Sequence, residues 1–147
     1  MLQDFLKPLK EASLSLYLIY LAIYIPWGFG MDAFGTWAEI AKFNNWWQVL
    51  TCYGVYMIPI SIILKGRPFL EQYAYGFVAM GLLEFGGYYF ETSYAYPNNS
   101  IEQLFGIRNF ALGMALFFGL YFPFGNWVVG LIYKQFSANW CIFETTY

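Results

Sequence analysis

The residues best suited to chemistry are charged side chains inside two apolar segments. Glu84 and Glu91 lie in one segment, and Arg108, followed by Asn109, lies in the next. An ionised group in hydrocarbon costs several kcal/mol unless it is paired or hydrated. Such a carboxyl group can exchange a proton with a bound substrate or line an ion path, and a carboxylate can also pair with the arginine. These residues are therefore the candidate site, with either a functional or a structural role.

The composition places these charges in a membrane protein. Of the 147 residues, 60% are hydrophobic, 24% aromatic and only 11% charged, far from the balance of a soluble domain. The net charge of -2 and the small number of Lys and Arg exclude nucleic acid as a partner, because binding phosphates needs a basic surface. The absence of histidine removes the commonest ligand of metals and haem and the usual partner of a catalytic nucleophile. We therefore predict neither a metal site nor a cofactor.

The hydropathy pattern predicts an all-α, integral membrane four-helix bundle that forms one domain over residues 1–147. The spans are expected at about 14–31, 46–64, 69–90 and 100–121, each close to the length that crosses a hydrocarbon core of about 30 Å. Residues 126–136 are compatible with a further helix, in the membrane or along its interface. Before the first span, residues 1–11 have an apolar and a charged face, which predicts a short interfacial helix that is retained as an anchor.

The distribution of cations predicts the orientation of this bundle. With the N-terminus in the cytoplasm, the cytoplasmic segments carry Lys7, Lys10, Lys65, Arg67 and Lys134. The opposite side carries Lys42 alone, and Arg108 lies within the membrane. Cytoplasmic loops are normally the richer in Lys and Arg. We therefore expect both termini on the cytoplasmic side.

The two charged segments should form an antiparallel hairpin with its turn near residues 95 and 96. A residue at 84 then lies at the depth of residues 107 and 108, given the rise of about 1.5 Å per residue. Small residues share the faces of these charges and permit close helix packing; they are Gly76 and Gly87 on one helix and Ala111, Ala115 and Gly119 on the other. We predict an intramembrane pair of Glu84 and Arg108, with Glu91 and Asn109 nearby, that fixes the helix register.

An aromatic stripe runs along the first span. Tyr17, Tyr20, Tyr24 and Trp27 recur at helical spacing. Such a stripe is typical of packing against neighbouring helices, and it can also form the wall against which a flat hydrophobic ligand stacks. Both interpretations remain open at the level of the sequence.

The segment from Gly106 to Gly113 resembles a motif of small DoxX-like four-helix membrane families of unknown function. In that motif a Gly, an Arg followed by Asp or Asn, and a second Gly open a span; here Gly106, Arg108, Asn109 and Gly113 occupy these positions. Asn109 stands where an acidic residue is usual. The resemblance implies a compact helical bundle and specifies no activity.

Together these patterns predict a small non-catalytic membrane protein that packs within a larger assembly, with membrane lipids and other membrane subunits as partners. The alternative is a membrane-embedded enzyme that performs isomerase-like acid/base chemistry on a lipid or isoprenoid, with Glu84, Glu91 and Arg108 as its candidate residues. A third alternative is a component of a proton or ion path, for which four spans with few polar residues are poorly suited.

Overall fold

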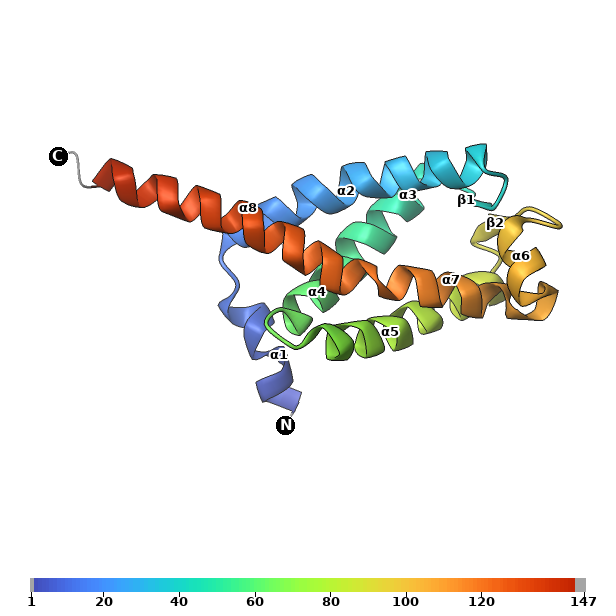
Figure 1. Ribbon diagram of the computed structural model, residues 1–147, viewed down its shortest axis with the longest axis horizontal. Helices are drawn as coiled ribbons and strands as arrows, with labels where there is room; N and C mark the ends of the chain where they lie inside the picture. The colour runs from blue at the N-terminus through green and yellow to red at the C-terminus, as the bar shows by residue number, and fades with distance from the viewer. Residues whose placement is uncertain (1, 145–147) are drawn as a thin grey trace.

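The computed structural model describes the chain from Leu2 to Glu144, with the side chains in that range except those of residues 2, 4, 5, 93 and 137–144. The protein is mostly helical (81%) (Figure 1). Its elements are α1 (Leu2–Glu11), α2 (Leu14–Trp37), β1 (Ala41–Phe43), α3 (Trp46–Val49), the π-helix η1 (Leu50–Met57), α4 (Ile58–Leu64), α5 (Phe69–Tyr89), β2 (Ser93–Ala95), α6 (Ser100–Phe105), the 3-10 helix η2 (Ile107–Asn109), α7 (Phe110–Gly119) and α8 (Tyr121–Glu144).

Among the described residues, three helical stretches are long and apolar enough to cross a membrane, judged by length and composition. They are Leu14–Trp37, Trp46–Leu64 and Ile107–Phe136. The first continues beyond the end we predicted at residue 31, and Pro26 lies inside it. In an apolar environment the backbone groups around a proline are best satisfied when the helix continues on both sides, which accounts for the longer helix.

The second stretch is continuous but changes its helical type. The eight residues of η1 form a π-helix between α3 and α4, and Pro59 follows in the first turn of α4. A proline ring crowds the carbonyl group one turn before it and provides no backbone N–H. The wider turn before Pro59 relieves this crowding and changes the direction in which the side chains of η1 point.

The region predicted as a single span over 100–121 is instead divided into α6, η2 and α7. Asn99 caps α6 by accepting hydrogen bonds from the backbone N–H groups of Ile101 (3.0 Å) and Glu102 (2.9 Å). Gly106 then ends this helix with φ 82° and ψ 154°, a conformation that is essentially restricted to glycine. The corrected arrangement places Arg108 in the short helix η2, before α7 begins.

A small antiparallel ribbon departs from the all-α prediction. Strand β1 pairs with β2 in the register Ala41 to Ala95 and Phe43 to Ser93. The ribbon joins the connection after α2 to the connection after α5, and it lies at the same end of the molecule as α6 (Figure 1). It therefore fixes the ends of two helices relative to each other.

The most extensive helix contact is between α5 and α7. Ala111, Ala115 and Gly119 are buried on α7, and a Cβ atom at Gly119 would lie 3.2 Å from the backbone of Phe77 on α5. Gly76 of α5 is also buried, but it faces the ring of Phe122 at the start of α8. The small side chains thus allow α5 to approach both α7 and α8.

Candidate functional site

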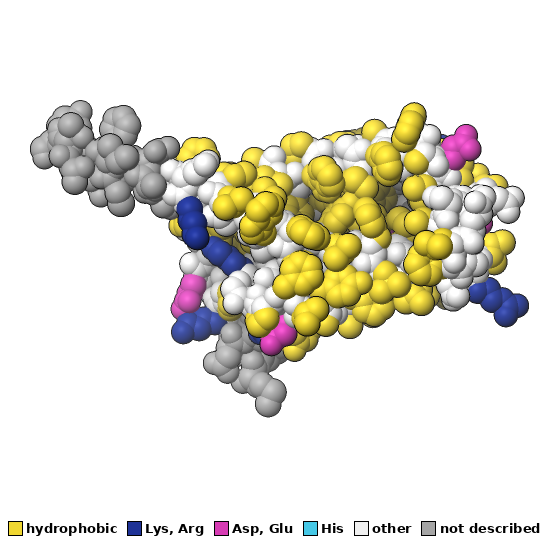
Figure 2. Space-filling view, viewed as in Figure 1, with side chains coloured by type: hydrophobic (Ala, Val, Ile, Leu, Met, Phe, Trp, Pro, Cys, Tyr) yellow, Lys and Arg dark blue, Asp and Glu magenta, His cyan; other side chains and the backbone are white. Residues whose placement is uncertain are grey.

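The site is a cavity of about 840 Å³ bounded by the C-terminal half of α2, the helices α3 and η1, the second half of α5, and α7. Strand β1 and residues near β2 border it at the ribbon end. In Figure 2 the face between α2 and α7 is hollowed and surrounded by hydrophobic side chains. This volume lies within the range of about 300–1,000 Å³ that is usual for small-molecule sites.

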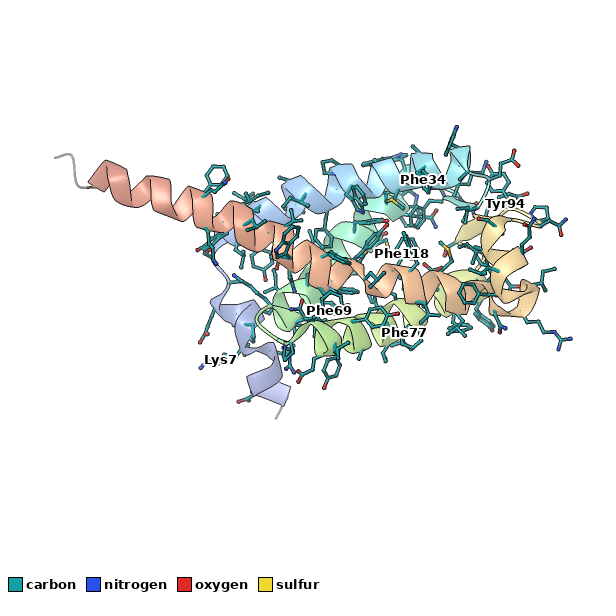
Figure 3. The ribbon with its side chains drawn as sticks, in the orientation of Figure 1. Lys7, Phe34, Phe69, Phe77, Tyr94 and Phe118 are labelled. Carbon is teal, nitrogen blue, oxygen red and sulfur yellow. The ribbon has the colours of Figure 1, made fainter. Side chains whose placement is uncertain are left out.

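Most of the cavity wall is aromatic or aliphatic. Phe34 of α2 and Phe118 of α7 lie on opposite sides of it (Figure 3). The other apolar side chains of the wall include Met31, Phe43, Trp47, Val55, Leu82, Leu83, Phe90, Ile101, Phe110, Met114 and Phe117. A wall of this kind favours a hydrophobic ligand, because filling the cavity with apolar atoms removes water from apolar surface.

The π-helix supplies one side of the cavity. Thr51, Cys52, Tyr53, Val55 and Tyr56 all belong to η1 and all line the cavity. The stretch of altered helical type therefore coincides with one side of the cavity, and π-helical turns are frequent at functional sites.

Glu84 is the acidic side chain that faces this wall from α5. It lines the cavity and is half-buried. No hydrogen bond or ion pair to its carboxyl group is present among the described residues, and Cys52 and Tyr53 of η1 line the same cavity. A carboxyl group without a protein partner can bind a polar group of a ligand or exchange a proton with it.

Three other polar side chains of the cavity have hydrogen-bond partners within the protein. Asp32 accepts a hydrogen bond from the backbone N–H of Phe43 (2.9 Å), and Tyr56 donates to the carbonyl oxygen of Ala79 (2.7 Å). Gln48 donates to the carbonyl oxygen of Thr92 (2.6 Å). Since these contacts hold the ribbon and the helices together, they are structural. Glu84 differs from them because its carboxyl group is not used in this way.

The structure does not form the predicted pair of Glu84 and Arg108. Arg108 is exposed on η2, and the described ion pairs are Lys7 with Glu11 and Arg67 with Glu71. The prediction assumed a continuous helix from residue 100, whereas Gly106 interrupts it. The arginine therefore lies at the end of the bundle and not within it.

Glu91 and Asn109, predicted near that pair, are also exposed. Glu91 follows α5 with a positive φ of 52°, and its carbonyl oxygen accepts a hydrogen bond from Asn44 (2.9 Å). The Asn109 side chain donates to the carbonyl oxygen of Phe105 (3.0 Å). Both residues shape the ends of helices. Of the candidate residues of the acid/base alternative, only Glu84 lines the cavity.

A double-mutant cycle tests this correction. We expect Glu84→Gln and Arg108→Gln to change the free energy of unfolding additively, within about 0.5 kcal/mol, because residues without a shared contact are seldom coupled. The measurement is reversible unfolding of the two single variants and the double variant in mixed micelles. A coupling energy above about 1 kcal/mol would show that Glu84 and Arg108 do interact, as the sequence predicted.

None of the four residues of the aromatic stripe of α2 lines the cavity. Tyr20 and Tyr24 are 0% and 3% exposed. The Tyr17 hydroxyl donates to the carbonyl oxygen of Leu9 in α1 (3.2 Å), and Trp27 meets the ring of Tyr121 edge to face at 6.2 Å. Of the two interpretations that the sequence left open, these contacts favour helix packing for Tyr17, Tyr20 and Tyr24.

A buried polar network, which the sequence did not predict, surrounds two of these tyrosines. Tyr20 donates to the side-chain oxygen of Asn126, and the Asn126 amide donates to the carbonyl oxygen of Ser61 (2.9 Å) and to Gln72 (2.7 Å). The Tyr24 and Ser61 hydroxyls are hydrogen-bonded at 2.7 Å. The network joins α2, α4, α5 and α8. Its signal in the sequence was isolated amides within apolar helices.

The remaining predicted site residues have separate roles. Gly87 lines the cavity, whereas Gly76, Ala111, Ala115 and Gly119 are packing residues of the helix contacts described above. In the motif that opens α7, Gly106 forms the break and Gly113 packs against Phe105 and Ile101 of α6. The motif thus shapes the α6–α7 corner.

Among the described residues, no group of three or more Cys, Asp or Glu side chains could hold a metal ion. Comparisons of the chain with protein-family models, with curated proteins and with solved structures found no match.

Proposed function

We propose that this protein is a multi-pass membrane protein that binds a hydrophobic, lipid-like molecule in the cavity between α2, η1, α5 and α7. The observation that carries the proposal is the combination of an apolar cavity of about 840 Å³ with one carboxyl group, that of Glu84, that has no protein partner among the described residues. Binding sites for small molecules typically combine an apolar wall with few polar groups that orient the ligand.

In this proposal α5 crosses the membrane together with the three more apolar stretches, and both chain ends lie in the cytoplasm. The alternating direction of α2, α4, α5 and α7 supports it (Figure 1). Figure 2 supports the orientation, since several Lys and Arg side chains gather at the end of the molecule near α1 and the turn between α4 and α5. The cytoplasmic side of membrane proteins is normally the more basic.

The thiol of Cys52 provides a direct test, because it is 8% exposed and lines the cavity. In a Cys141→Ser background, we expect a small apolar thiol reagent to modify Cys52 in delipidated protein. At least one member of a decyl series (decylamine, 1-decanol or decanoate) should slow the modification about tenfold. The Met114→Trp variant, which fills the cavity, should slow it without any added probe.

A matched cysteine outside the cavity controls for partitioning of the reagent into micelles. Val78 is 59% exposed on α5 and does not line the cavity. A Val78→Cys variant in a Cys52→Ser/Cys141→Ser background should react at the same rate with and without the probes. If none of the three probes changes the modification rate of either cysteine, the cavity does not bind such molecules and the proposal is wrong.

A second candidate function is that of a subunit in a larger membrane assembly. The feature that favours it is α8, whose C-terminal part extends beyond the other helices (Figure 1). Leu131 and Phe136 on this helix are 48% and 59% exposed, so the helix has apolar surface for a partner helix or for lipid. Purification from the native membrane in mild detergent tests this proposal, which predicts a stoichiometric protein partner that is lost when α8 is truncated after Lys134.

A further inference from the structure

We propose that the ligand of this cavity is a hydrophobic cation, such as a protonated amine attached to an apolar body, with the carboxylate of Glu84 as its counterion. This inference rests on the proposed binding function and names the class of ligand. Its starting point is the charge of the wall. Two acidic side chains, Asp32 and Glu84, and one basic side chain, Lys42, line the cavity, so the formal charge of the lining is negative.

The basic side chain is already engaged at the ribbon end. The Lys42 ammonium lies 5.7 Å from the ring centroid of Tyr94 and 5.9 Å from that of Tyr96, within the range of cation–π contacts. The Asp32 carboxylate accepts the N–H of Phe43. The charge on Glu84 therefore remains without a counterion among the described residues.

An ionised carboxylate in such a position is costly unless a cation or water accompanies it. A cationic ligand removes this cost, whereas an anionic one adds repulsion. A neutral ligand contributes at most a hydrogen bond to the carboxylate, which offsets less of this cost than a cation does.

The aromatic wall favours the same class of ligand. Tyr53, Phe117 and Phe118 line the cavity together with Trp47 and Phe110. Aromatic faces attract cations through their quadrupole, and binding sites for ammonium groups combine such rings with a hydrophobic enclosure. The apolar body of the ligand would occupy the remainder of the cavity, where its burial contributes in proportion to the area removed from water.

The decyl series separates this inference from the general binding proposal. With Cys52 protection in detergent-solubilised protein as the readout, we expect decylamine to be effective at concentrations about tenfold lower than 1-decanol. Decanoate should be the weakest. In Glu84→Gln the advantage of the amine over the alcohol should disappear, while protection by 1-decanol remains and shows that the cavity is intact.

Glu71→Gln is the matched control, because Glu71 lies on the same helix, is exposed and pairs with Arg67 at 3.4 Å. This substitution also removes one negative charge, but at a position outside the cavity, so the variant should keep the preference for the amine. Equal protection by amine and alcohol in the unmodified protein would overturn the cation inference and leave the binding proposal standing. Preference for decanoate, or an amine preference that survives in Glu84→Gln, would overturn it as well. Failure of all three probes would overturn both.

Discussion

Replacing Asn126 with alanine is expected to lower the free energy of unfolding by about 2–4 kcal/mol. Asn126 is 8% exposed and contacts Tyr20 on α2, Ser61 on α4 and Gln72 on α5. The alanine leaves the Tyr20 hydroxyl and the Gln72 side-chain oxygen without that partner. Each buried polar group left unsatisfied costs about 1–3 kcal/mol. Interhelical hydrogen bonds in membranes lie toward the lower end of that range.

The measurement is equilibrium unfolding of the purified protein in mixed micelles, monitored by the far-UV circular dichroism signal of its helices. Asn109→Ala is the control, since that asparagine is exposed and bonds within its own corner, to the carbonyl oxygen of Phe105. Its loss should cost less than about 0.5 kcal/mol. If both substitutions have the same effect, the network does not hold the helices together. Tyr20→Phe, which removes one hydroxyl and retains the ring, should reproduce a part of the Asn126→Ala effect.

The presence of helices long and apolar enough to cross a membrane was predictable because it depends on summed properties of long segments. Apolar runs of sufficient length indicate α2 and the α3–α4 stretch regardless of their detailed contacts. Local signals with a single physical cause were predictable too. Asn99 caps α6 with two hydrogen bonds, and asparagine is one of the residue types favoured at that position. In both cases the information lies within the segment itself.

The position of Arg108 shows why the candidate pair was not predictable. Depth matching across a hairpin requires a continuous helix, and one residue, Gly106, decides whether the helix is continuous. Glycine is tolerated inside a helix, since Gly76 and Gly81 both lie within α5. The sequence alone therefore does not distinguish a glycine that packs from a glycine that ends a helix. That difference moved the arginine from the interior to the surface.

The cavity was not predictable for a related reason. Its wall combines residues from distant segments, and the short ribbon that borders it has no periodic pattern. The sequence analysis did identify Glu84 as an unusual charge, because an isolated acidic residue in an apolar run is visible locally. The aromatic stripe of α2 was visible in the same way, but its periodicity shows only that the four side chains share one face of the helix. Whether that face meets a ligand or a neighbouring helix depends on tertiary contacts.

Replacing Gly76 with valine is expected to destabilise the protein by about 3 kcal/mol, since overpacking a well-filled core typically costs about 1–3 kcal/mol and branched additions cost more. A Cβ atom at this position would overlap the ring of Phe122. Phe122 is fully buried at 0% exposure, so its ring has no free space into which it can move. The contact between α5 and the start of α8 must therefore open.

Gly81 provides the matched control on the same helix, because a Cβ atom there would meet nothing within 4 Å. Gly81→Val should change the free energy of unfolding by less than about 1 kcal/mol, with the difference in helix propensity as its main component. The same unfolding assay in mixed micelles compares the two. Phe122→Leu provides a rescue, since a smaller side chain at 122 makes room for the valine. The double variant Gly76→Val/Phe122→Leu should be more stable than the sum of the single effects by at least about 1 kcal/mol. Strict additivity would show that α5 and α8 do not meet at Gly76 and Phe122.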